Sequence, residues 1–336
     1  MTWKERRTIT ILTTILLVLS AILLVVLGIR YREHRDETGD AAAVQNSIDI
    51  LPAADPNAYT ALTYTNGTVT LSFTQDSGGV WLWDADKDFP LDDTQVTGIL
   101  ALLTNWRPQQ VLKDQEALDG SGMEDAVASL TATTAGGGTT TLLFGKATTD
   151  GLSDYVRLNG DETTVYIIDG ALRRSMDIPI YDMCRLPELP ALAEADMRTV
   201  TLQGPAPEEG NAGPETILLA QSSGGTASWR CGGADVTNDS TVRALMEDLT
   251  ALKVSKCVDY APSEEAAQIC GFDSPQAVLR IVYTEDGQDA ELTLTVGGRL
   301  LDKSGRYVRL GEEPAIYLLE TALLDPMMRI AANGLE

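Results

Sequence analysis

Polar and apolar residues alternate with a period of two near the start of the chain. The alternation runs from residue 69 to 73 and again from 80 to 83, on either side of a Gly-Gly pair. Such a pattern predicts two half-buried strands joined by a turn. A helical spacing follows, behind Asp92 or Asp93, whose carboxylate can cap a helix by accepting from a free N–H. This spacing places four apolar residues on one helix face: Val96, Ile99, Leu100 and Leu103.

The same pattern returns in the second half of the chain. Subtracting 146 aligns Trp229 with Trp83, and a second Gly-Gly pair with the first. The offset later grows to 152, where the Tyr-Val-Arg-Leu run at 307–310 aligns with that at 155–158. An internal repeat indicates one supersecondary unit used twice, so we expect the shared residues to be structural. The second predicted helix, behind Asn238 or Asp239, carries Val242, Leu245, Met246 and Leu249.

We predict an α+β fold, a tandem duplication of an antiparallel β-sheet module with one main amphipathic helix in each copy. The first copy covers residues 48–182 and the second residues 191–331, with a proline-punctuated joint at 186–190. After each main helix we expect a short strand, an acidic turn, three more strands, a last strand and a short closing helix. These elements are expected at 110–112, 126–133, 139–144, 155–158, 165–168 and 170–175, and again at 256–258, 277–284, 290–296, 306–310, 316–319 and 320–330.

An uninterrupted apolar segment lies near the beginning of the chain. Residues 8–29 contain no charge and no proline, and at about 1.5 Å per residue a helix of this length crosses the roughly 30 Å of a bilayer core. The segment is too long for a cleaved signal peptide, and no small-residue cleavage site follows it. We therefore expect a single-pass transmembrane signal anchor, with residues 1–7 as a cytoplasmic tail, residues 30–47 as a linker and the bulk of the chain extracytoplasmic. This orientation rests on the long acidic chain downstream, because Lys and Arg are equally numerous on both sides of the span.

The formal net charge of −24 restricts the partners of the chain. It excludes ordinary nucleic-acid binding, which depends on basic patches that displace counterions from phosphate. It also argues against lying on an anionic lipid surface. Contact with the lipid bilayer is thus expected through residues 8–29.

Four cysteines are present, at Cys184, Cys231, Cys257 and Cys270, and their spacing contains no CxxC pair. A zinc site is therefore not expected. A disulfide such as Cys257–Cys270 and small buried thiols both remain open, because a free cysteine packs like a small apolar residue.

The single histidine, His34, lies in the linker, where no folded scaffold can hold it as a catalytic base or zinc ligand. Asp84, Asp86 and Asp88 have the alternate spacing of a calcium loop, but Phe89 stands where that loop needs glycine, and the second copy lacks these acids. The glycines at 136–138 and 297–298 lack the lysine of a phosphate loop and are predicted to form hairpin turns. We accordingly expect no catalytic residues, no metal and no cofactor.

Four repeated aromatic residues are the candidates for a ligand or partner surface: Trp83, Trp229, Tyr155 and Tyr307. We expect Tyr155 and Tyr307 to pack on their own sheets, and a paired aromatic ligand site is the alternative, because tyrosine commonly serves both roles.

The order of these motifs resembles the bacterial family of domains of unknown function numbered 4340 (DUF4340). The resemblance covers most of residues 48–331 and rests on the strand-end tryptophan, the Asp-capped helix, the turn at 271–275, the Tyr-Val-Arg-Leu strand and the Val-Tyr-x-Ile strand. The first copy departs from it, because its turn at 122–125 lacks the proline. Members are typically tethered by one N-terminal span and are often encoded near ABC-transporter permeases of the gliding-motility type. The resemblance thus implies a membrane-tethered accessory protein and supplies no catalytic residues.

We expect a non-catalytic, membrane-anchored, extracytoplasmic accessory or scaffold module of the bacterial cell envelope. Its association with an ABC-transporter-type membrane complex rests on the resemblance alone. Two alternatives stay open. One is a ligand-binding sensor with a cleft between the two copies, and the other is an envelope hydrolase that uses carboxylates.

Overall fold

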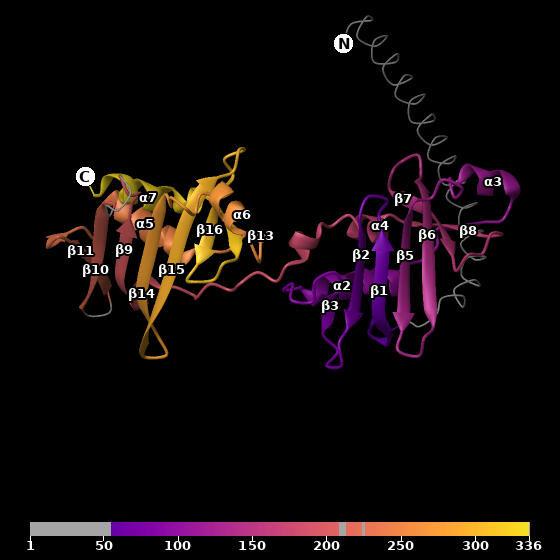
Figure 1. The fold of residues 1–336 in the computed structure, drawn as a ribbon, viewed down its shortest axis with the longest axis horizontal. Coiled ribbons are helices and arrows are strands. Elements are labelled where there is room, and N and C mark those ends of the chain that lie inside the picture. Colours follow the sequence, from indigo (N-terminus) through magenta and orange to yellow (C-terminus); the bar gives the residue numbers. More distant parts are fainter. Residues whose placement is uncertain (1–54, 208–212, 224–225, 336) are drawn as a thin grey trace, which may run out of the picture. The chain divides into compact units, whose positions relative to one another are not determined.

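The computed structural model describes residues 55–207, 213–223 and 226–335. These residues form two units, each built on its own sheet (Figure 1). Unit 1 comprises the described residues up to 85 together with 93–178, and unit 2 comprises 86–92 and the chain from 179 onward. The predicted membrane anchor at 8–29 and the linker at 30–47 lie outside the described residues. Within the described ranges, no helix has the length and apolar character needed to cross a membrane.

Unit 1 is an eight-stranded sheet in which every neighbouring pair is antiparallel, in the order β3-β2-β1-β5-β6-β7-β8-β4. Its strands are β1 (Tyr59–Thr65), β2 (Thr70–Gln75), β3 (Trp81–Trp83), β4 (Gln110–Leu112), β5 (Ala128–Thr134), β6 (Thr139–Ala147), β7 (Ser153–Leu158) and β8 (Val165–Asp169). Its helices are the 3-10 turn η2 (Pro56–Ala58), α2 (Asp93–Asn105), α3 (Gln115–Gly120) and α4 (Ala171–Ser175).

Unit 2 is a nine-stranded antiparallel sheet with the matching order β12-β11-β10-β9-β14-β15-β16-β17-β13. Its strands are β9 (Met197–Gln203), β10 (Glu215–Ser223), β11 (Thr226–Cys231), β12 (Ala234–Asp235), β13 (Lys256–Asp259), β14 (Ala277–Glu285), β15 (Gln288–Arg299), β16 (Gly305–Leu310) and β17 (Ile316–Glu320). Its helices are η3 (Ile180–Met183), η4 (Glu194–Asp196), α5 (Ser240–Thr250), α6 (Glu264–Ile269) and α7 (Thr321–Asn333).

The α+β class, the antiparallel sheets and the duplication are confirmed. The prediction omitted one interior strand of each sheet, β1 and β9, although both carry alternating apolar residues. In β1 the alternation is clear at Leu62 and Tyr64, but a register shift against β5 between Tyr59 and Ala61 interrupts it. The short closing helix at 170–175 is confirmed as α4, which has 5 residues, whereas α7 is longer than expected, with 13 residues, and packs beside α5.

Each sheet buries one face under its main helix. The predicted apolar faces are confirmed, because all four residues of each face are buried in α2 and in α5. Full burial of one such side chain contributes roughly 1.5–3 kcal/mol relative to exposure. The α5 cap is Asp239, whose Oδ1 accepts from Thr241 N at 2.8 Å and from Val242 N at 3.0 Å.

A second feature common to both units is a turn that docks on a strand through the backbone. After α3 the Ser121 carbonyl accepts from Lys146 N at 3.0 Å, and after α6 the Cys270 carbonyl accepts from Gly298 N at 2.7 Å. The strand register shifts at this point in both units. A Cβ at Gly145 or Gly297 would overlap the docked carbonyl oxygen. The hairpin turn predicted at 297–298 is therefore wrong, because both glycines lie inside β15 and Gly297 is needed for the close approach of the turn carbonyl.

We predict that Gly297→Ala lowers the free energy of unfolding by about 1–3 kcal/mol, because the added methyl group pushes the α6 turn off β15. The measurement is urea or thermal unfolding of the full chain followed by circular dichroism. Gly298→Ala is the matched control, since a Cβ there would lie 3.4 Å from the Cys270 oxygen, an ordinary contact. Equal unfolding midpoints for the two variants would contradict this account of the docked turn.

Candidate functional site

The four aromatic candidates lie at separate places in the two sheets. Trp83, at the end of β3, and Tyr155, in β7, are half-buried. Four strands lie between β3 and β7 in the sheet. The two strands are therefore five inter-strand spacings of about 4.8 Å apart, which is about 24 Å. Tyr307 is half-buried in β16, and burial together with the nearby Cys270 thiol raises its pKa. Within each unit, therefore, the structure does not bring the tryptophan and the tyrosine together.

Trp229 lies in the core of unit 2 with 1% of its surface exposed. Its indole Nε1 donates a hydrogen bond of 2.8 Å to Glu194 Oε1. Trp229 therefore packs on its own sheet and holds the η4 segment through Glu194, which is itself exposed.

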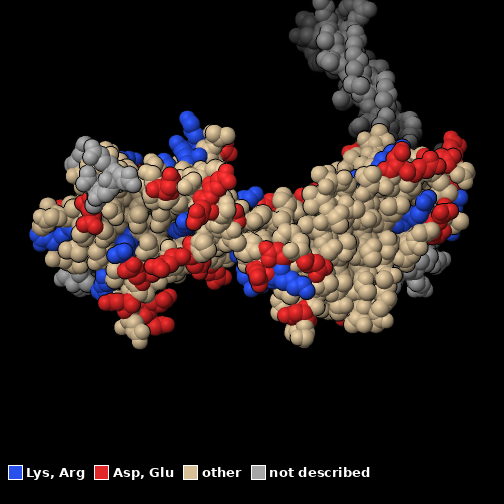
Figure 2. Space-filling view, viewed as in Figure 1, with Lys and Arg blue, Asp and Glu red and all other residues tan. Residues whose placement is uncertain are grey.

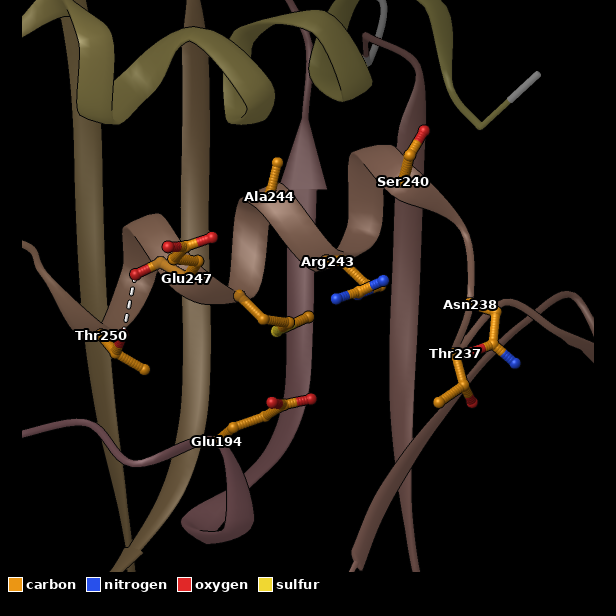
Figure 3. A pocket seen from close by; sticks show the side chains of 9 residues that line it. Glu194, Thr237, Asn238, Ser240, Arg243, Ala244, Glu247 and Thr250 are labelled. Carbon is orange, nitrogen blue, oxygen red and sulfur yellow. Dashed lines mark hydrogen bonds between the residues drawn. The ribbon is translucent and has the colours of Figure 1, made fainter.

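A polar hollow of about 630 Å³ lies beside α5 in unit 2 (Figure 3). Figure 3 shows Arg243 and Glu247 of α5 and Glu194 of η4 around the same space. Its size is within the range of small-molecule sites, and a guanidinium next to carboxylates suits a small polar or zwitterionic molecule. Its remaining lining residues are Thr237, Asn238, Ser240, Ala244, Met246 and Thr250.

The acidic run at Asp84, Asp86 and Asp88 is part of the turn structure. Asp84 Oδ1 accepts from Thr74 Oγ1 at 2.6 Å, and Asp86 Oδ1 accepts from Asp88 N at 3.1 Å. The Tyr260 hydroxyl donates to Asp86 Oδ2, and this hydrogen bond raises the pKa of Tyr260 to about 12. Among the residues that the structure describes, no cluster of three or more His, Cys, Asp or Glu side chains could hold a metal ion.

Phe89, which lies in the same segment, is a core residue of unit 2 with 3% exposure. Its ring meets Tyr181 edge-on at 5.7 Å and Tyr260 edge-on at 5.3 Å between centroids. This segment follows the end of β3 in the first copy but belongs to unit 2, an arrangement that the repeat did not predict.

All four cysteines are free thiols, and Cys231 is the only one that is not buried. The Cys184 and Cys257 thiols interact with each other. Their hydrogen bond lowers the pKa of Cys184, and the same hydrogen bond together with burial raises the pKa of Cys257. The thiol pairing thus differs from the Cys257–Cys270 bridge that the sequence left open.

The outward face of the unit 1 sheet is the largest surface without charge in Figure 2, over β2, β1, β5 and β6. Strands β1, β2, β3 and β5 contain no charged residue. Hydroxyl side chains occupy most of the outward positions, and we call this surface the hydroxyl face. Its members are Thr63, Thr65, Thr70, Ser72, Thr74, Ser129, Thr131, Thr133, Thr139 and Thr141.

Cross-strand hydrogen bonds connect the hydroxyl groups of this face. Thr63 Oγ1 donates to Ser72 Oγ at 3.1 Å, and Thr131 Oγ1 and Thr141 Oγ1 lie 3.2 Å apart. Thr63 and Thr131 are register partners between these two pairs, so one row of hydroxyls crosses four strands. Because these groups partly satisfy one another, covering them costs less than covering unpaired polar groups.

The corresponding face of unit 2 carries charges at equivalent positions. There Thr201 is flanked in register by Ile217 and Arg280, and Arg280 is paired with Thr293. Arg280 thus occupies the place of Thr131, and its Nε lies 3.2 Å from Glu291 Oε1. The fold therefore accepts charge on this face. The sequence prediction missed the hydroxyl face, although comparing the polar positions of the two copies could have found it.

We predict that Thr131→Arg, which copies the unit 2 residue at a half-buried outward position, changes the free energy of unfolding by less than about 0.5 kcal/mol, as is usual for substitutions outside the core. The measurement is urea unfolding of the full chain. Leu130→Arg, at the neighbouring inward position with 0% exposure, is the contrasting variant and should unfold unit 1. A loss of 2 kcal/mol or more in Thr131→Arg would show that the sheet itself requires a hydroxyl there.

Comparison with known proteins agrees with this architecture. Residues 81–221 and 233–332 match the family described as a domain of unknown function (DUF4340). No match was found to a curated protein or to a solved structure. The two matched segments together cover most of the chain and take in the main helix of each copy. On this match, the chain belongs to the DUF4340 family.

Proposed function

We propose that this chain is a non-catalytic, membrane-anchored, extracytoplasmic scaffold module that works through protein–protein contact. The hydroxyl face carries the proposal, because a broad uncharged sheet surface stands out on a chain with a net charge of −24. Interface centres are depleted in charged residues, and threonine offers both a methyl group and a hydroxyl group to a partner. The anchor is residues 8–29, an apolar segment long enough to span a bilayer.

The proposed partner complex is an ABC-transporter-type membrane assembly of the bacterial envelope. Support for this choice is the resemblance of the repeated motifs to a family often encoded near such permeases. A scaffold in this setting needs an anchor, a folded module and a contact surface. Residues 8–29, the duplicated sheets and the hydroxyl face are assigned to these three tasks.

A ligand-binding sensor is the second candidate function, and the hollow beside α5 favours it. The sequence interpretation placed such a cleft between the two copies, whereas this hollow is lined by residues of unit 2. Arg243 would receive a carboxylate, and Glu194 or Glu247 an amine. A small molecule whose binding is lost in Arg243→Ala would support the sensor over the scaffold.

We expect the full chain, crosslinked in native membranes and purified in mild detergent, to enrich subunits of an ABC transporter. Quantitative mass spectrometry against an untagged strain measures the enrichment. Thr63→Glu, on the hydroxyl face, should reduce it at least about 5-fold, since burying one unpaired charge costs more than 1 kcal/mol. The matched control is Thr201→Glu, at the same place in unit 2 and next to Arg280. Absence of transporter subunits from the wild-type sample would refute this partner.

The orientation of the chain has its own test. Ser77 lies exposed in the hairpin between β2 and β3, so Ser77→Cys should react with a membrane-impermeant maleimide in intact cells. Thr2→Cys, in the predicted cytoplasmic tail, should react only after lysis. Wild type supplies the background from Cys231, which is half-buried. The reverse labelling pattern would place the units on the cytoplasmic side.

A further inference from the structure

We propose that the occupant of the hydroxyl face is the hydroxyl face of a second copy of this chain. This inference rests on the proposed function in taking the face as a protein-contact surface. It makes the dimer formed through this face the form that transporter subunits bind elsewhere on the chain, so Thr63→Glu lowers transporter capture by dissociating the dimer. It goes further by naming the partner and the residues that meet.

Charge selects the partner. A cationic protein gains most by binding the acidic surfaces of a chain with net charge −24, and an uncharged sheet face offers it the least. A second copy carries the same negative charge and is repelled by those surfaces. For that partner the uncharged face is the most favourable approach, because like charges within about 10 Å repel and more distant ones are screened by salt.

The surface chemistry also fits contact between two identical faces. Neutral hydroxyls that already bond across strands, as Thr63 does to Ser72, lose little when water is removed. Threonine methyl groups and Leu143, which pairs with Ser129, add apolar area. Two sheet faces can pack with their strands nearly aligned, at about 10 Å separation. A twofold axis through the Thr63–Thr131 pair would bring equivalent rows together, as in the commonest type of homodimer.

The area of the face sets the strength of the contact. Four strands about 4.8 Å apart, each contributing about 20 Å of length, give roughly 400 Å² per copy in projection. Stable complexes bury about 800 Å² per partner, so this contact belongs to the weak, concentration-dependent class. The exposed side chain of Val127, at 66%, has the outward parity of Ser129 and Thr131 and enlarges the apolar area.

Unit 2 provides the internal comparison. Its equivalent row contains Arg280, which pairs with Glu291 on the same surface. Two such surfaces could meet only by covering two ion pairs, and the cost of desolvating four charges can exceed the attraction within the pairs. Self-association is thus assigned to unit 1 and not to unit 2.

The test is analytical ultracentrifugation of the purified full-length chain in detergent over a wide range of protein concentration. We expect a reversible monomer–dimer equilibrium for wild type and for Thr201→Glu. Thr63→Glu should raise the dissociation constant at least about 10-fold, because it places two carboxylates in the contact. Raising the salt from about 50 mM to about 500 mM should strengthen the dimer, since salt screens the repulsion between acidic rims.

Two outcomes overturn the proposal. A dimer that is equally stable in Thr63→Glu would place the contact elsewhere, for example in the membrane anchor. A wild-type chain that stays monomeric at all concentrations would remove the second copy as occupant. If transporter subunits are still captured through Thr63 in that case, the proposed function stands and the inference alone fails. A dimer that is sensitive to Thr63→Glu, with no transporter subunits captured, would support the self-association and refute the transporter partner.

Discussion

Every strand in these sheets presents alternate side chains to opposite faces, and the rest of the structure depends on this constraint. The side chains on the inward face must pack against the apolar face of a helix, and those on the outward face need not. The inward residues are accordingly mostly apolar in both units, from Leu62 and Leu130 to Val200 and Leu279. The outward residues have diverged into an uncharged row in unit 1 and a charged row in unit 2.

The duplication therefore separates structure from candidate function residue by residue. The two glycines that admit the docked turns, Gly145 and Gly297, are needed in both units because a side chain would strike the turn carbonyl. Arg309 of the repeated Tyr-Val-Arg-Leu strand stacks over Phe272 at 4.4 Å, so it also supports that turn. Residues shared by the copies thus explain the fold, and differences such as Thr131 against Arg280 indicate where a partner could act.

The surface residues predicted from the sequence do not include the hydroxyl face. Both copies keep the predicted aromatic residues, and a residue kept in both copies of a repeat is a sign of packing; Trp229 is in fact buried in the core. The hydroxyl face was missed for the complementary reason. Its threonines and serines look like ordinary solvent-facing positions until β1, β2, β5 and β6 are placed side by side.

The sequence by itself determined the elements with strong local periodicity: the α2 and α5 faces, a cap at Asn238 or Asp239, the repeated hairpins and the family. These follow from contacts between residues close together in the chain, for which spacing is sufficient information. Only the tertiary structure decided the strand order, which sets Thr63 beside Thr131, and the pairing of the Cys184 and Cys257 thiols. Such contacts join distant segments, and their register depends on the packing of the whole sheet against its helices.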